Sequence, residues 1–310
     1  MDSLAIDRRA LPADARLSRW QAPDGWSYRR IDWSLPDAAR GSLLFAGGRG
    51  DFIEKYVEPL GHWRAQGWRV TSFDWRSQGG SRGDIAGGHL DSLDVLVDDL
   101  AALIEDWRRE APGPHVVIAH SMGGHVLARV LAERRPALDA AVLVAPMLMV
   151  NSAPFPAWAA AWIAAGMTAI GFGKVPLLRG VSPLPPTGSP RQAILTGCPE
   201  RYSDELYWWQ KEPGYNLGGP SWGWVRAAFR SSAALTRDRL AGIEVAVLLV
   251  ATARDRLVSP TAIRKAAATI PGAELLMFPD AGHEILREAD PVRLEALAAI
   301  DDFLARKAGA

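Results

Sequence analysis

A serine stands at the most informative turn in this sequence. In the segment HVVIAHSMGGHVLARV, an apolar run that predicts a β-strand leads into Ser121, and a helical pattern begins at the next residue. So tight a turn strains its middle residue, exposes that side chain and requires small residues two positions to either side. Ala119 and Gly123 meet this requirement. Ser121 is therefore predicted to be a nucleophile, with a plain helix N-cap as the alternative.

A hydroxyl becomes a good nucleophile when a base removes its proton, so a histidine is needed. Of the six histidines, His283 follows the last predicted strand, in a loop that would lie at the same sheet edge as Ser121. The other five precede Ser121 or lie on its own turn and helix: His62, His89, His115, His120 and His125. His283 is the predicted base.

The base needs a carboxylate to orient it, and in serine hydrolases built on parallel sheets this acid lies between the serine and the histidine in the chain. Asp255 follows the apolar run VAVLLVA, at the C-terminal end of the penultimate predicted strand. It could instead cap the helix near Pro260, although Ser259 occupies that N-cap position better. The nearest rival, Asp280, could serve as a turn residue. Asp255 is the predicted acid.

Attack on a carbonyl carbon builds negative charge on its oxygen, which two backbone N–H groups must stabilise. One donor is expected from Met122, directly after the nucleophile. The other is expected from AGGRGDF, the glycine-rich loop after the strand that ends at Ala46. We predict Arg49 as this second donor, with a plain glycine turn as the alternative for that segment.

The elements that must position these residues form an α/β pattern, in which short apolar runs alternate with helical patterns. This predicts a mostly parallel central sheet flanked by helices. The predicted strands are Ser42 to Ala46, Trp68 to Phe73, His115 to Ala119, Ala140 to Ala145, Val245 to Ala251 and Ala273 to Phe278, with Tyr28 to Trp33 as an edge strand. The predicted helices are Asp91 to Glu110, Met122 to Arg135 and Asp290 to Lys307.

The alternation breaks between about Pro146 and Asp238, where Pro, Gly and Trp accumulate. Six of the thirteen tryptophans lie between Trp158 and Trp224. We expect a helical cap, or lid, at residues 147–238, inserted into a core domain of residues 28–146 and 239–310. Residues 1–27 are expected to be an N-terminal extension. The aromatic side chains suit a cap that lines an apolar pocket, although tryptophans more often fill ordinary cores.

No charged residue occurs between Asp139 and Lys174. Pro154 and Pro156 interrupt this stretch, and the uninterrupted remainder is shorter than the roughly 20 residues of a membrane-spanning helix. We therefore expect a buried or cap helix here, with weak contact between the cap and a membrane surface as the alternative.

Composition excludes several other classes. Thirty-five basic residues balance thirty-five acidic ones, so the basic surface of a nucleic-acid binder is not expected. The single cysteine, Cys198, can form neither an internal disulfide nor a zinc site. The first twenty residues lack the apolar stretch of a secretory signal. These observations predict a cytoplasmic protein, and with no HExxH motif or P-loop in the sequence, one that uses neither cofactor nor metal.

With these residues placed, the chain resembles the α/β-hydrolase branch that contains lysophospholipases and monoacylglycerol lipases. The likeness covers about Tyr28 to Lys307. The family's HGxGEHSGRY, DxRGHGxS, GHSMGG, GxxDxxV and GxxHExxxE motifs correspond here to GGRGDFIEKY, DWRSQGGS, AHSMGG, ATARDRLV and DAGHEILRE. This resemblance also aligns Arg49 with the oxyanion donor. The sequence departs from the family where HG becomes Gly47 and Gly48, where RGHG becomes RSQG, and where Ala119 replaces glycine.

The resemblance implies a serine esterase that cleaves small or lipid-like acyl esters through an acyl-enzyme. Two other enzymatic reactions use the same three groups, namely hydrolysis of carbon–carbon bonds and formation of peracids. A protein of another class, which keeps the fold and cap but only binds a ligand, is the remaining alternative. The sequence predicts no particular oligomeric state.

Overall fold

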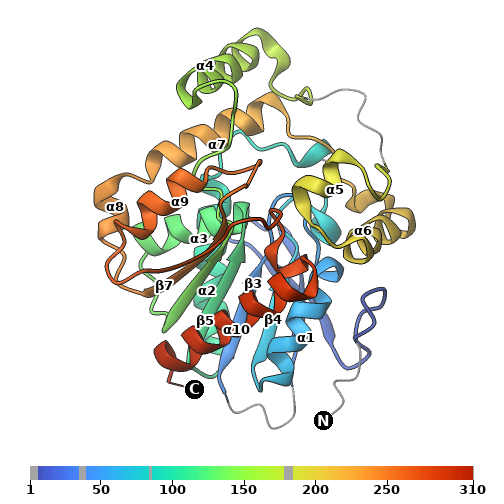
Figure 1. The fold of residues 1–310 in the computed structure, drawn as a ribbon, viewed down its shortest axis with the longest axis vertical. Coiled ribbons are helices and arrows are strands. Elements are labelled where there is room, and N and C mark those ends of the chain that lie inside the picture. The colour runs from blue at the N-terminus through green and yellow to red at the C-terminus, as the bar shows by residue number, and fades with distance from the viewer. Residues whose placement is uncertain (1–5, 35–39, 84–85, 178–183, 310) are drawn as a thin grey trace.

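The computed structural model describes residues 6–34, 40–83, 86–177 and 184–309 (Figure 1). These residues form an eight-stranded sheet in the order β1-β2-β4-β3-β5-β6-β7-β8, in which β1 and β2 run antiparallel to their neighbours and the other pairs are parallel. The strands are β1 (Arg16–Gln21), β2 (Ser27–Trp33), β3 (Ser42–Ala46), β4 (Arg69–Phe73), β5 (His115–His120), β6 (Ala140–Val144), β7 (Ala246–Thr252) and β8 (Glu274–Phe278).

The N-terminal region departs from the prediction. Strand β1 lies inside the segment expected to be an extension, and it pairs with β2 along its whole length. Strand β2 therefore lies between β1 and β4, so its prediction as an edge strand was wrong. The sequence RLSRWQ hides this strand because Trp20 is its one buried side chain, which leaves no alternating apolar pattern to recognise.

Helices cover both faces of the sheet (Figure 1). On one face lie α2 (Asp94–Glu110), α3 (Met122–Glu133) and α9 (Pro260–Ala267), and on the other lie α1 (Val57–Ala65) and α10 (Asp290–Lys307). Alternate side chains of each strand join the two cores, so that Leu44 packs with the first group and Phe45 with the second. Apolar side chains at helical spacing on α2 and just before it are buried: Leu93, Leu96, Val97, Leu100, Leu103 and Ile104.

The remaining helices lie between β6 and β7, which is the region predicted to form a cap. They are α4 (Ala157–Met167), the π-helical turn η4 (Thr168–Phe172), α5 (Pro190–Leu195), α6 (Pro199–Lys211), η5 (Pro213–Tyr215), α7 (Trp222–Ala234) and α8 (Arg237–Ala241). Short 3-10 turns elsewhere are η1 (Ile53–Tyr56), η2 (Gly79–Ser81), η3 (Ala86–Gly88) and η6 (Ile285–Arg287). The exact cap boundaries at 147 and 238 stay a prediction.

The tryptophans of the cap differ widely in exposure. Trp208, Trp209 and Trp224 are buried, whereas Trp158 and Trp162 on α4 are exposed to 69% and 75%. Helix α4 projects beyond α7 at the top of Figure 1. Among the residues described, no helix combines the length and the apolar character needed to cross a membrane.

Candidate active site

Ser121 occupies the sharp turn between β5 and α3. Its φ of 52° and ψ of −114° are a strained conformation for a residue with a side chain. The turn is held because the Ser121 N–H donates to the Val144 carbonyl at 2.9 Å, while the Ser121 carbonyl accepts from the His125 N–H at 3.0 Å. A Cβ at position 123 would lie 2.3 Å from the Gly47 carbonyl oxygen. Glycine at position 123 therefore allows α3 to start directly against the loop after β3.

The three predicted groups come together at the carboxyl ends of the parallel strands. His283 Nε2 lies 2.8 Å from Ser121 Oγ, and His283 Nδ1 lies 2.7 Å from Asp255 Oδ2. The other carboxylate oxygen of Asp255 accepts from the N–H groups of Leu257 and Val258, at 2.8 and 3.0 Å. His283 and Asp255 are buried and Ser121 is half-buried. This arrangement can remove a proton from the serine hydroxyl.

The charges of this group suit a base and its orienting acid. Burial opposes protonation of His283, but the neighbouring Asp255 carboxylate outweighs burial and raises the pKa of the imidazole above its ordinary value. Burial alone would raise the pKa of Asp255, yet His283 and the two N–H donors hold it below the usual range. Asp255 therefore stays ionised and stabilises the imidazolium that forms when His283 takes a proton.

The rival residues lie elsewhere. The Asp280 carboxylate is exposed and pairs with Arg254 at 2.7 Å. His125 is buried on α3, where its Nε2 lies 2.6 Å from Ser231 Oγ, and burial, with a smaller contribution from the charge of Arg129, lowers its pKa to about 3. Among the described residues, neither the Asp280 carboxylate nor the His125 imidazole is hydrogen-bonded to the side chains of Ser121, His283 or Asp255; each is paired elsewhere.

The glycine-rich loop after β3 lies beside the serine. A Cβ at position 48 would lie 3.0 Å from Ser121 Cβ, so the loop can approach the serine because Gly48 lacks a side chain. A Cβ at position 47 would lie 2.9 Å from Asp51 Cβ. A side chain at position 47 would therefore require Asp51 or the loop to shift. Met122 is the first residue of α3, where helix N–H groups lack an intrahelical acceptor.

The Arg49 side chain has a role that the sequence did not suggest. Its guanidinium donates to the carbonyl oxygens of Gly87, Gly218 and Gly219 at 2.9 to 3.2 Å, and it lies over the Trp224 ring at 5.2 Å. Burial lowers the pKa of Arg49 to about 10, so the side chain is charged at neutral pH. It ties the glycine-rich loop to the cap segment that precedes α7.

Sequence reasoning also missed a buried ion cluster beside the site. Lys55 Nζ lies 2.7 Å from Asp51, 3.1 Å from Glu205 and 2.6 Å from Glu284, and all four side chains are buried. Glu284 directly follows His283, and Glu205 belongs to cap helix α6. The two acidic neighbours at positions 51 and 284 lie within recognised motifs, but the partner at 205 is 150 residues from Lys55 and has no motif to reveal it.

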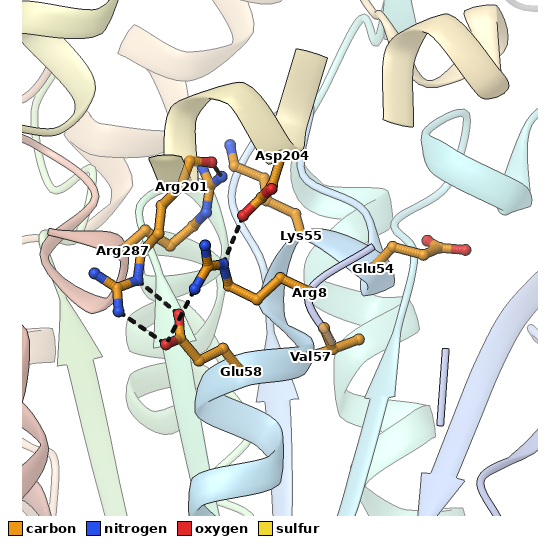
Figure 2. A pocket seen from close by; sticks show the side chains of 8 residues that line it. All are labelled: Arg8, Glu54, Lys55, Val57, Glu58, Arg201, Asp204 and Arg287. Atoms are coloured by element: carbon orange, nitrogen blue, oxygen red, sulfur yellow. Dashed lines mark hydrogen bonds and ion pairs between the residues drawn. The ribbon is translucent and has the colours of Figure 1, made fainter. Parts of the chain in front are cut away.

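Next to this cluster is a small hollow (Figure 2). Its walls carry charges of both signs, from every lining residue except Val57: the lining residues are Arg8, Glu54, Lys55, Val57, Glu58, Arg201, Asp204 and Arg287. Arg8 donates to Asp204 at 2.6 Å, and Arg201 donates to Glu58 at 2.6 Å. These ion pairs connect the N-terminal segment and α1 to cap helix α6. Ser121, Asp255 and His283 are not among the residues that line this hollow.

Comparisons with known proteins show the family of this chain. Residues 37–290 match the family described as serine aminopeptidase, S33. Lysophospholipase L2 of Escherichia coli strain K12 is 32% identical over 290 residues, covering 85% of this chain and 80% of that protein. A probable lysophospholipase L2 of Haemophilus influenzae is 28% identical over 275 residues, covering 86% of this chain and 84% of that protein.

Solved structures share the fold over almost the whole chain. A soluble variant of monoglyceride lipase from Saccharomyces cerevisiae superposes with a TM-score of 0.76 at 16% identity, covering 98% of this chain and 99% of that one. A monoacylglycerol lipase from Paleococcus ferrophilus gives 0.69 at 21% identity, covering 90% and 98%. The predicted α/β-hydrolase fold with a cap is confirmed, and the chain belongs to the serine aminopeptidase S33 family, together with the lysophospholipases L2 that it matches.

Proposed function

We propose that this protein is a serine esterase that hydrolyses carboxylic esters of lipid-like substrates, such as lysophospholipids and monoacylglycerols. The observation that carries the proposal is the hydrogen-bonded series Ser121–His283–Asp255, at 2.8 and 2.7 Å. The identity to lysophospholipase L2 supports the ester class and the lipid-like acyl group.

In the first step, Ser121 Oγ attacks the ester carbonyl carbon while its proton moves to His283 Nε2. Asp255 stabilises the imidazolium, and the carbonyl oxygen becomes an oxyanion held by the N–H groups of Arg49 and Met122. The tetrahedral intermediate then collapses, the bond to the alcohol oxygen breaks, and His283 gives its proton to the departing alcohol. An acyl-enzyme on Ser121 remains.

In the second step, His283 removes a proton from water, and the resulting hydroxide attacks the acyl carbon. Collapse of this second intermediate breaks the bond to Ser121 Oγ, which regains its proton from His283. The carboxylic acid leaves and the enzyme returns to its starting state.

The cap suits a substrate that resides in a lipid surface. Helix α4 has the sequence AWAAAWIAAGM, without a charged residue, and Trp158 and Trp162 are four residues apart on the same side. Exposed tryptophans on an apolar helix insert into the interfacial region of a bilayer. We therefore infer that the protein contacts a membrane surface weakly through α4.

The first experiment is labelling with a fluorophosphonate probe, on the unchanged protein and on Ser121→Ala. We expect labelling of the unchanged protein alone. Turnover is then compared across p-nitrophenyl esters of increasing chain length, a lysophospholipid, a monoacylglycerol and amino acid p-nitroanilides, which represent the class in the family's description. Hydrolysis of the anilides without the esters would contradict the proposal, as would a folded protein that is not labelled.

The membrane contact is tested by sedimentation with phosphatidylcholine vesicles. Replacing Trp158 and Trp162 together by serine is expected to reduce vesicle binding severalfold while leaving hydrolysis of p-nitrophenyl acetate unchanged. Leu294→Ser is a control, because Leu294 is an exposed apolar residue on α10, a different element from α4. Equal binding by all three proteins would disprove a role for α4.

A further inference from the structure

The loop from Gly47 to Asp51 presents several backbone N–H groups near Ser121, and two of them are occupied by side chains. The Gly48 N–H donates to Asp51 Oδ2 at 2.5 Å. The Gly50 N–H donates to Gln78 Oε1 at 2.6 Å. Both N–H groups are therefore already paired with side-chain acceptors of the protein.

The N–H group between them is different. Within the described chain, the Arg49 N–H has no hydrogen-bond partner. The residue before it lies against Ser121, since a Cβ on Gly48 would contact Ser121 Cβ at 3.0 Å. The carbonyl contacts of the Arg49 side chain with Gly87, Gly218 and Gly219 hold this residue in place. Arg49 therefore offers an unpaired N–H beside the nucleophile.

Gln78 is suited to fixing this loop. Its side chain is fully buried, and because Gly50 provides a donor, the contacting atom must be the amide oxygen. The other end of the amide, Nε2, is buried without a hydrogen-bond partner among the described residues. A buried amide normally satisfies both ends. In Gln78 the amide oxygen accepts a hydrogen bond and the amide nitrogen donates none to a described residue. This indicates that the role of the Gln78 side chain is its contact with Gly50.

The turn that carries Gln78 is itself joined to the same loop. The Asp74 carboxylate accepts from the Ile53 N–H at 2.8 Å and from the Gly80 N–H at 2.7 Å. The Gln78 N–H donates to the Trp75 carbonyl at 2.9 Å. The turn from Asp74 to Ser81 thus contacts this part of the chain at two points, Gly50 through Gln78 and Ile53 through Asp74.

We propose that Asp51 and Gln78 are positioning residues, which engage the N–H groups on either side of Arg49 and so select the Arg49 N–H as the second oxyanion donor. This inference rests on the proposed esterase function. Gln78 stands where the RGHG motif of the family has histidine. Neither residue touches the substrate; they act by orienting the donor before the oxyanion forms.

The test compares Gln78→Met, which keeps the length of the side chain without a strong acceptor, with Gln78→Glu, which keeps an acceptor oxygen. For p-nitrophenyl butyrate, we expect Gln78→Met to lower kcat at least about tenfold with KM within twofold, because the interaction is made in the transition state. Labelling of Ser121 by a fluorophosphonate should slow in parallel. Gln78→Glu should recover most of the lost kcat.

The melting temperature separates this role from a structural one. Methionine also removes the unpartnered Nε2, so Tm should change little in Gln78→Met although kcat falls. An unchanged kcat, equal losses in Gln78→Met and Gln78→Glu, or a loss of kcat that merely follows unfolding would overturn the inference.

A second pair of variants tests the donor itself, whether or not Gln78→Met folds. Arg49→Pro removes the N–H and the guanidinium, whereas Arg49→Ala removes the guanidinium alone. We expect kcat to fall about 100-fold further in the proline variant than in the alanine variant, the effect of one oxyanion donor. Equal activities would overturn the assignment. If the unchanged protein neither reacts with the probe nor turns over esters, the proposed function fails and this inference fails with it.

Discussion

The backbone N–H of His283 donates to the carbonyl oxygen of Ile194, 3.0 Å away at the end of cap helix α5. The next residue repeats the contact, since the Glu284 N–H donates to the Leu195 carbonyl at 2.8 Å. The loop that carries the proposed base therefore rests on the cap. This part of the cap cannot move away from the core without breaking both bonds, so α5 belongs to the support of the site.

Gly282→Ala tests this support. A Cβ at position 282 would lie 2.5 Å from the Leu195 carbonyl oxygen, so it must push the His283 loop away from α5. We expect kcat for a p-nitrophenyl ester to fall at least about tenfold, because small displacements of catalytic groups are costly. Gly166→Ala on α4 is the control, since a Cβ there meets nothing within 4 Å. Similar kinetics in both variants would show that the contact does not position the base.

The pH dependence follows from the paired charges of His283 and Asp255. The base must be neutral, and Asp255 raises the pKa of His283, so kcat/KM should fall as pH decreases, with a midpoint above the ordinary histidine value of about 6.5. Asp255→Asn should shift this midpoint to lower pH and reduce kcat about 10³- to 10⁴-fold at neutral pH. Asp280→Asn should leave the profile of the unchanged protein intact. A midpoint unaffected by Asp255→Asn would contradict the assigned pairing.

Lys55→Met should destabilise the fold strongly. The substitution leaves the carboxylates of Asp51, Glu205 and Glu284 buried around an uncharged side chain, which costs about 3–5 kcal/mol of unfolding free energy. Urea denaturation measures this loss. The matched control is Lys307→Met, whose partner Glu274 is partly exposed and whose loss should cost at most about 1 kcal/mol. Comparable losses of unfolding free energy in the two variants would mean that the buried cluster contributes little to stability.

His125 should make the protein sensitive to acid. Burial, together with the charge of Arg129, lowers the pKa of this histidine to about 3, whereas in the unfolded chain it is near 6.5. Between these values the unfolded chain binds a proton that the folded protein does not, so stability falls as pH decreases from about 6.5 to 3. His125→Leu should reduce the slope of unfolding free energy against pH there by up to about 1.4 kcal/mol per unit. An unchanged slope would rule this contribution out.

Much of the site was predictable because the chemistry depends on local sequence. Ser121 and Asp255 each follow a buried strand closely, and His283 follows the last one, so the carboxyl ends of a parallel sheet had to bring them near one another. The backbone geometry of the turn at Ser121 required Gly123, which the sequence contained. The three side chains lie as the sequence led us to expect, and their catalytic roles now await the labelling experiment.

Other features were not predictable because their partners are distant in the chain. Lys55 is 150 residues from Glu205 and 229 residues from Glu284, so no local pattern connects them. Strand β1 was missed because its exposed polar residues lack the apolar alternation of a recognisable strand. The aromatic residues of the cap suited a cap that lines an apolar pocket. Only the fold reveals that Trp158 and Trp162 are exposed while Trp224 is buried.

The attachment of α4 has a consequence for how this protein can diverge and be redesigned. Helix α4 packs on the molecule through small side chains, with Ala164 buried and Ala160 and Ala161 against the core, whereas α5 holds the loop of His283. Residues on the outer face of α4 can therefore change under selection for a different membrane surface, while the positions of the catalytic groups stay the same. Laboratory selection for binding to a different membrane surface should accordingly yield substitutions on that face of α4 and none in α5.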